Sequence, residues 1–350
     1  MLSLYDHHRR IEGPLTAWWE GADQQHPGLL LTLPQEGGPA PPSTDDLHRQ
    51  WFDVEYALEH ALYGMERTRY LGVAAPVHCP SLGSAAMAGV LGARMEYVDG
   101  RTIWPRPSGR SLEEMLEVRL DPDNEYYRTL LEMTRRSAAC SRDHHWVAPF
   151  PLEGPGDCLE GVYGAFELFT TMVDRPELVE AAVKHFTRLW LQAFEEVEWI
   201  IEGAGNPGGI GWAGIWAPGR TFPLQEDFSY NLSPAMFRRF VLPSLREIVE
   251  AVPYPMFHLD GTIAHLPALL EIPGLRAIQW VPGPGREGIA QWYDLIRAIR
   301  ERGKSVEVFC TADEVDDLVA SVGARGLLIG VTECTPEQAE RLLDRYADAP

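Results

Sequence analysis

Short apolar segments alternate with helical segments along almost the whole chain, and this alternation constrains the fold more than any other feature. Eight of the apolar segments predict strands, at 29–33, 70–78, 144–152, 208–216, 254–259, 275–283, 305–310 and 327–331. Strands separated by helices pair in parallel, because a parallel pair needs a long crossover connection. Eight such units predict an α/β fold, a (β/α)8 TIM barrel.

The chain is long enough to form this barrel as one domain. Its 350 residues are 45% hydrophobic and 23% charged, which is an ordinary globular composition. No internal repeat, low-complexity tract or linker divides the sequence. We therefore predict a single barrel domain over 1–350, in which 1–45 form an N-terminal extension that includes the first strand.

The chain is strongly acidic, with 51 acidic residues, 30 basic residues and a formal net charge of −21. Such a surface repels phosphates, so the charge argues against nucleic acid or an anionic membrane as a partner. The sequence has no apolar run long enough to span a bilayer and no signal-type apolar segment after its first residues, which predicts a cytoplasmic protein. The oligomeric state stays open, with a homodimer as one option.

The stretch 254–262 carries the sharpest chemical signal. It predicts a buried strand that ends in His258-Leu-Asp-Gly261 and is followed directly by a helix. Side chains alternate along a strand, so His258 and Asp260 would share one face at its carboxyl end, where barrel enzymes place their active sites. A histidine and a carboxylate in this arrangement bind a metal ion or share a proton. The alternative is a histidine held by its neighbouring aspartate, with Asp260 capping the next helix.

Further polar and aromatic residues follow the other strands or lie in the loop before the Ser233-Pro234 helix start. The candidate catalytic carboxylates, as ligands or general bases, are Glu226, Asp227 and Asp260. The candidate substrate-binding residues, all expected around a small-molecule site, are His78, Trp212, Trp216, Tyr230 and Trp280. The alternatives are solvated surface groups for the carboxylates and core positions for the tryptophans.

The predicted metal ligands are His258, Asp260 and Cys334, which together offer Zn²⁺ one nitrogen, one oxygen and one sulfur donor. They follow the fifth and the eighth predicted strands, so they would reach across the barrel mouth and leave a fourth position open to the substrate. The five cysteines are scattered and form no C-x-x-C pair, which argues against disulfides. The alternative for Cys334 is a small buried hydrophobic residue.

Several motifs resemble those of the uroporphyrinogen decarboxylase superfamily, which includes zinc-dependent methyltransferases that act with corrinoid proteins. The matching motifs are the segment 222–243 with its Ser233-Pro234 and Leu242-Pro243 pairs, Ala75-Pro-Val-His-Cys-Pro-Ser-Leu-Gly83, His258-Leu-Asp-Gly261 and Ile278-Gln-Trp-Val-Pro-Gly283. The resemblance covers 45–347 and implies a (β/α)8 barrel. It also implies that His258 and Cys334 match the zinc ligands of the methyltransferases, while Asp260 stands in place of a cysteine. The Arg-Gln-Ala-Gly-Arg motif of the true decarboxylase is absent, so a tetrapyrrole substrate is not expected.

Three functions are therefore open at this point. The first is a zinc-dependent methyltransferase-like enzyme that activates a thiol or another nucleophile at the barrel mouth, with the methyl group supplied by a methylcorrinoid on a carrier protein. The second is a metal-independent decarboxylase of a small carboxylate, with Asp260 or Glu226 stabilising a protonated intermediate. The third is a non-catalytic binding barrel. Nothing in the sequence names the substrate.

Overall fold

A seven-stranded sheet forms the centre of the protein, in a computed structural model that describes residues 3–99, 103–283, 285 and 288–346. Its strand order is β2-β1-β13-β12-β11-β10-β9. All neighbours in this order pair in parallel except β2, which is antiparallel to β1. The strands are β1 (Gly28–Pro34), β2 (Thr68–Gly72), β9 (Thr221–Leu224), β10 (Tyr254–Asp260), β11 (Ala277–Val281), β12 (Ser305–Cys310) and β13 (Leu327–Val331).

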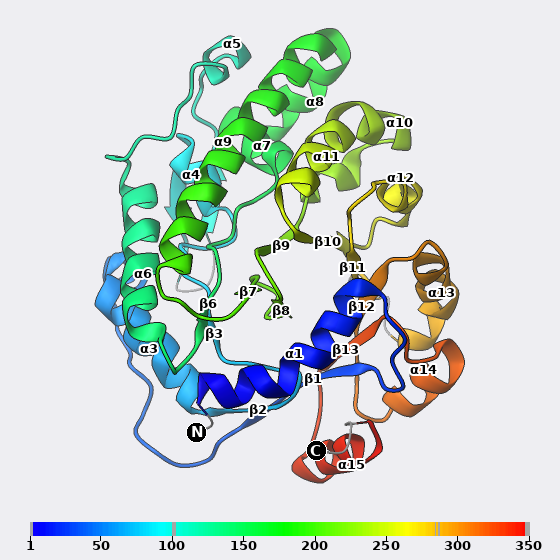
Figure 1. Ribbon diagram of the computed structural model, residues 1–350. Coiled ribbons are helices and arrows are strands. Elements are labelled where there is room, and N and C mark those ends of the chain that lie inside the picture. The colour runs from blue at the N-terminus through cyan, green and yellow to red at the C-terminus, as the bar shows by residue number, and fades with distance from the viewer. Residues whose placement is uncertain (1–2, 100–102, 284, 286–287, 347–350) are drawn as a thin grey trace.

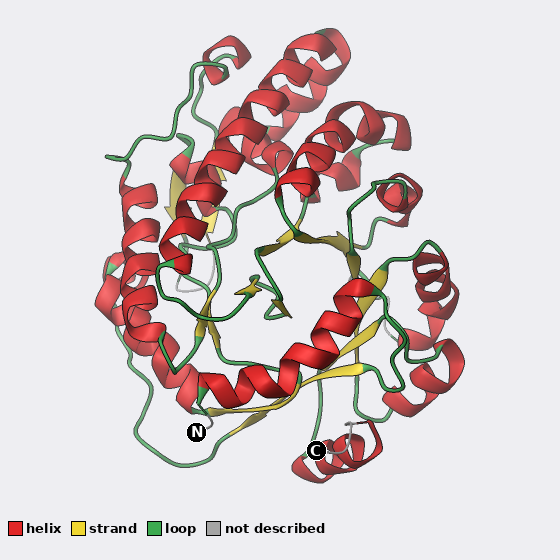
Figure 2. Ribbon diagram, viewed as in Figure 1, coloured by secondary structure: helices red, strands yellow, loops and turns green. Residues whose placement is uncertain are grey.

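Shorter ladders account for the other strands of the described residues. They are the parallel pair β3 (Val77–His78) and β6 (Trp146–Val147), and the antiparallel pairs β4 (Arg94–Tyr97) with β5 (Ile103–Arg106) and β7 (Gly209–Ile210) with β8 (Trp216–Ala217). Strands lie around the centre of the molecule and most helices lie outside them (Figure 2). The predicted α/β class is confirmed, whereas the described ladders form four separate pieces rather than one closed barrel.

Helices follow most of the parallel strands. They are α1 (Leu4–Glu20), α2 (Leu47–Phe52), α3 (Val54–Glu66), α4 (Ala86–Val90), α5 (Leu112–Met115), α6 (Glu125–Ser141), α7 (Pro155–Tyr163), α8 (Ala165–Asp174), α9 (Pro176–Glu202), α10 (Pro234–Met236), α11 (Leu242–Ala251), α12 (Leu266–Leu270), α13 (Tyr293–Glu301), α14 (Val315–Val322) and α15 (Pro336–Tyr346). The predicted helix start at Ser233 is confirmed, because its side chain accepts from the Met236 N–H. At the start of α15, Thr335 forms a capping box with Gln338. Within the described part of the chain, every helix is too short or too polar to cross a membrane.

Three predicted strands differ from the structure, and in two of them a glycine is the reason. The predicted strand 144–152 pairs only at 146–147, as β6. The predicted strand 208–216 is instead a hairpin of β7 and β8, because Gly214, between them, adopts a φ angle of 75° that turns the chain back. On the side away from β11, β10 pairs with β9, which lies in a segment predicted to be a loop. The predicted strand 70–78 is divided into β2 and β3 after Gly72, whose φ is 58°.

Helix α1 covers the amino-terminal ends of the parallel strands, a position that the sequence did not reveal (Figure 1). Its buried face carries apolar side chains that recur at helical spacing, namely Leu4, Ile11, Leu15, Trp18 and Trp19. They pack in one buried cluster with residues from the starts of β10, β11 and β13. Polar groups are satisfied there too, because the Trp19 indole N–H donates to the Trp216 carbonyl at 2.8 Å. The carboxyl ends of the strands are thus the end that α1 leaves uncovered.

We expect Trp18→Ala to destabilise the protein by about 3–5 kcal/mol, because it removes a fully buried indole from the cluster under α1. The measurement is the urea midpoint of unfolding, followed by circular dichroism. The control is Trp199→Ala on α9, where the side chain is 74% exposed, and it should change little. Equal losses in the two variants would show that α1 does not contribute to the core in this way.

Candidate active site

The side chain of His258 is held in place by its neighbours on the sheet. The parallel register sets His258 of β10 beside Gln279 of β11, and Gln279 beside Glu307 of β12. His258 Nδ1 lies 2.5 Å from Gln279 Oε1, and Gln279 Nε2 donates to Glu307 Oε2 at 2.5 Å. Because the amide nitrogen donates to Glu307, the amide oxygen accepts from the Nδ1–H of His258. The Nε2 atom of His258 is then left with its lone pair, as a general base needs.

Burial gives the carboxyl group of Glu307, at the end of this row of hydrogen bonds, an unusual pKa. Gln279 and Glu307 are both buried, at 4% and 1% exposure. Burial raises the pKa of Glu307 to about 8, although the hydrogen bond from Gln279 opposes that shift. Glu307 therefore retains its proton in the folded protein over part of the neutral range.

Trp212 packs directly against His258. The two rings meet edge to face, with centroids 5.5 Å apart. The indole N–H of Trp212 donates to the Pro223 carbonyl at 2.8 Å, which fixes the ring against the imidazole. Trp212 thus lies beside the candidate base, where the sequence predicted a substrate-binding aromatic residue.

A cavity of about 200 Å³ opens next to His258, at the carboxyl ends of β9 and β10. Its lining comprises Glu226, Asp227, Ser229, Tyr230, Phe257, His258, Leu259, Asp260 and Thr262. All three carboxylates predicted to be catalytic are in this set, together with His258 and Tyr230. The structure thus brings these five predicted residues together around one small polar cavity.

Two carboxyl groups of the cavity, those of Glu226 and Asp227, carry raised pKa values. Burial raises the pKa of Asp227, nearby His258 opposes this shift, and Asp260 adds to it. Burial, reinforced by Asp157, raises the pKa of Glu226 well above its usual value. Glu226 also accepts a hydrogen bond from the Gly156 N–H, with Oε2 at 3.1 Å. The cavity is acidic, yet Glu226 and Asp227 hold protons more tightly than exposed carboxyl groups do.

A further buried acid, Asp157, lies behind Glu226. Asp157 accepts from the Phe228 N–H at 2.8 Å, and its other oxygen has no partner among the described residues. Burial and the charge of Asp227 raise the pKa of Asp157 to about 7. Gly156 allows the close approach of this segment, since a Cβ there would lie 2.0 Å from Cε1 of Phe228. The first turn of α7 therefore packs tightly on 226–228 and supports the acidic wall.

Two of the predicted tryptophans lie elsewhere. Trp280 is fully buried and packs edge to face on Trp292, at 4.9 Å between centroids. Side chains alternate along β11, so Trp280 points to the opposite face from its neighbour Gln279. Trp216 packs in the cluster under α1 and donates to the Pro207 carbonyl at 2.8 Å. Both are core residues, and their prediction as substrate-binding residues is corrected.

His78 also points away from the cavity. Its Nδ1 lies 2.8 Å from Ser137 Oγ on α6, and the same hydroxyl lies 3.1 Å from His145 Nε2. Burial lowers the pKa of His78 to about 4, so this imidazole is neutral at neutral pH. The prediction of His78 as a substrate-binding residue is corrected, because the side chain joins β3 to α6.

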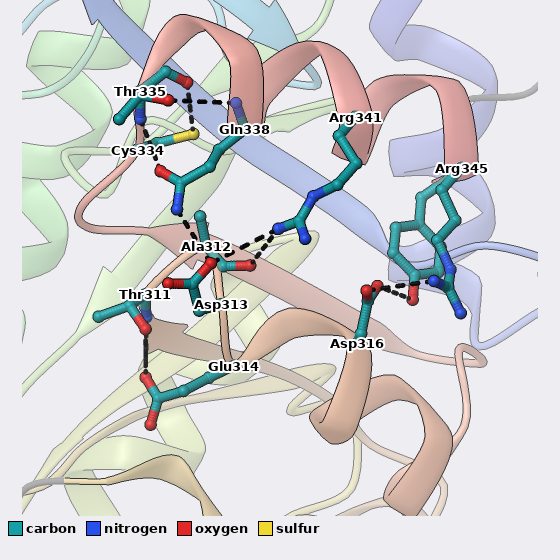
Figure 3. A network of polar contacts seen from close by, with 11 residues as sticks. Thr311, Ala312, Asp313, Glu314, Asp316, Cys334, Thr335, Gln338, Arg341 and Arg345 are labelled. Carbon is teal, nitrogen blue, oxygen red and sulfur yellow. Dashed lines mark hydrogen bonds and ion pairs between the residues drawn. The ribbon is translucent and has the colours of Figure 1, made fainter.

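Cys334 does not lie with His258 and Asp260. Figure 3 shows it at the start of α15, beside Thr335 and Gln338. Its thiol donates to the Thr335 carbonyl at 3.4 Å, and burial raises its pKa while Arg341 opposes the shift. The capping box of α15 turns the chain here and directs Cys334 toward the helices.

The predicted zinc set therefore does not fit this arrangement. Within residues 3–99, 103–283, 285 and 288–346, no three His, Cys, Asp or Glu side chains are grouped closely enough to hold a metal ion. His258 and Asp260 line the cavity without the third donor that the prediction required of Cys334. We assign no chemical step to zinc.

Sequence reasoning missed Gln279 and Glu307. Both are polar residues within otherwise apolar strands, and that is the signal that singles them out. Their connection to His258 depends on the register between β10, β11 and β12, which the sequence alone does not show.

Comparison with known proteins adds a likeness of fold. No family model matches the chain, and no curated protein matches it in sequence. Among solved structures, a methyltransferase from Methanosarcina mazei is similar, with a TM-score of 0.59 and 13% sequence identity. The match covers 99% of this chain and 98% of that chain. The two proteins therefore share a fold over nearly their full lengths.

We expect Glu307→Gln to flatten the pH dependence of stability between about pH 5 and pH 8. The unfolded chain releases the Glu307 proton above the usual pKa of 4.5, whereas the folded protein keeps it up to about 8. This group's contribution to stability is thus full below pH 4.5 and is lost as the pH rises to 8. The measurement is the urea midpoint at several pH values.

Glu250→Gln, at an exposed position of α11, is the matched control for Glu307→Gln and should keep the pH profile of the unmodified protein. The same profile in the Glu307→Gln variant would contradict a buried Glu307 that stays protonated.

Proposed function

We propose that this protein is a methyltransferase-like enzyme in which His258 is the general base for a small nucleophile. The observation that carries the proposal is the hydrogen-bonded row His258–Gln279–Glu307, which leaves Nε2 of His258 free to take a proton. The shared fold with a protein named as a methyltransferase supports the reaction class. We also propose that the described ladders belong to one (β/α)8 barrel, with the parallel pairing of β1 and β9 to β13 as its support.

The proposed step is a displacement at a methyl carbon. His258 Nε2 takes the proton from a thiol, hydroxyl or amine as its heteroatom attacks the methyl group. The bond from the nucleophile to carbon forms, the bond to the donor breaks, and the electron pair leaves with the donor. Gln279 keeps the ring oriented, and the carboxylates of Asp227 and Asp260 stabilise the imidazolium that results. Trp212 covers one side of the base and limits its contact with water.

The charge and size of the cavity narrow the substrate class. Three carboxyl groups line about 200 Å³, which is smaller than most ligand pockets. An anionic group entering this space would meet like charges wherever these carboxyl groups are ionised, while a neutral or positively charged group would not. This disfavours decarboxylation of a small carboxylate at this site. It favours a neutral nucleophile or a positively charged methyl donor.

The remaining predicted cofactor, a methylcorrinoid, would be the donor of the methyl group. A methylcorrinoid on a carrier protein stays part of the proposal through the motif resemblance, and it would present its methyl group at the end of the sheet that α1 leaves uncovered. The residues of this chain that we assign to the reaction are the base, its row and the cavity carboxylates.

The test is methyl transfer by the purified protein, with methylcorrinoid, sulfonium and quaternary ammonium donors, thiol and amine acceptors, and mass spectrometry of the products. We expect His258→Ala to lower kcat about 100-fold or more, because general-base catalysis contributes at least that much. Gln279→Leu should lower kcat less than His258→Ala does, and it should shift the pH profile of kcat. His60→Ala, on the exposed face of α3, is the control.

Two outcomes would contradict the proposal. One is a His258→Ala variant that keeps its activity within about threefold of the unmodified protein, since a base contributes far more than that. The other is binding of small ligands at the cavity without product from any donor and acceptor pair, which would support the binding-barrel alternative.

A further inference from the structure

A second and larger cavity lies between α1, the start of β1, the end of β2 and α15. Its volume is about 610 Å³, within the range of sites that bind small organic molecules. It shares no lining residue with the cavity at His258. It lies on the amino-terminal side of β1, whereas the candidate active site lies at the carboxyl ends of its strands.

The walls of this cavity are mostly apolar. They include Pro14, Ala17, Leu29, Leu71, Val73 and Leu343. Two charged or titratable residues at its edge have other contacts. Asp23 is largely exposed and pairs with Arg325 at 3.6 Å, while His26 meets the ring of Tyr346 edge to face.

Arg10 places a positive charge in this apolar wall. Its guanidinium donates to the Tyr70 carbonyl at 2.8 Å and to the Ala74 carbonyl at 2.6 Å. Its Nε is buried and has no hydrogen-bond partner among the described residues. No carboxylate of the described residues forms an ion pair with Arg10. A half-buried cation without an anion is costly, and a bound anion would offset that cost.

We propose that this cavity binds a small apolar acid, with its carboxylate on Arg10 and its hydrocarbon body between α1, β1 and α15. The carboxylate lies beside the guanidinium of Arg10 in the cavity wall and neutralises its charge. The apolar body replaces water along the wall, which supplies the rest of the affinity. This proposal does not depend on the reaction at His258.

Gly13 gives a way to fill the cavity without disturbing its walls. It lines the cavity on α1, and a Cβ added there would meet no atom within 4 Å. A larger side chain at this position therefore has room to occupy the ligand's space. Gly64 on α3 has the same freedom, with no atom within 4 Å of an added Cβ, but does not line the cavity. Gly13→Leu and Gly64→Leu are thus a matched pair.

The test is isothermal titration of the protein with 2-naphthoate and with the uncharged 2-naphthalenemethanol. We expect one naphthoate to bind per chain, at least about tenfold more tightly than the alcohol. Arg10→Met should remove that preference, because it keeps the apolar stem and deletes the charge. Gly13→Leu should weaken the binding of both compounds about tenfold or more, and Gly64→Leu should change the affinity for neither.

The proposal is overturned if naphthoate does not bind at about 1 mM, a concentration at which even weak ligands bind. It is also overturned if a folded Gly13→Leu protein binds both compounds as tightly as the Gly64→Leu protein. If Arg10→Met does not fold, the preference of the unmodified protein for the acid over the alcohol decides the role of the charge. Equal affinity for the two compounds would exclude Arg10 as the anion's partner.

Discussion

The hydrogen-bonded row His258–Gln279–Glu307 crosses three parallel strands, and the proposed chemistry depends on it. It exists because β10, β11 and β12 pair in a register that sets three polar side chains side by side. Each member satisfies the next, so a buried carboxyl group and a buried amide are tolerated within an apolar sheet. The row also determines which nitrogen of His258 carries the proton, which is what makes the ring a base toward the cavity.

In our proposal, the surroundings of His258 determine which substrates the base accepts. The tight packing of the first turn of α7 against 226–228 brings Asp157 behind the cavity, so the wall facing His258 is negative or holds protons, according to pH. Where its carboxyl groups are ionised, such a wall discourages anions. At the other end of the strands, α1 closes the sheet with a cluster of tryptophans. The fold therefore packs α1 against one end of the strands and leaves the candidate site at the other end.

Part of this site could be predicted from the sequence, because it depends on local rules. The alternation of side chains in a strand placed His258 and Asp260 at one cavity, and the loop before Ser233 contributed Glu226, Asp227 and Tyr230. What could not be predicted depends on pairing between distant segments. The assembled sheet sets the register that joins Gln279 and Glu307 to His258. It also directs Trp280 to the opposite face, where this side chain packs on Trp292. The turn at the start of α15 likewise removed Cys334 from the predicted zinc set.

The central claim is that His258 is held as the Nδ1–H tautomer with Nε2 unprotonated toward the cavity. The most direct measurement is nitrogen-15 NMR of the histidine side chains, with the His258 signals assigned by comparison with His258→Gln. At a pH where the ring is neutral, this account predicts one dominant form with the proton on Nδ1. A dominant Nε2–H form, or an even mixture of the two tautomers, would contradict it.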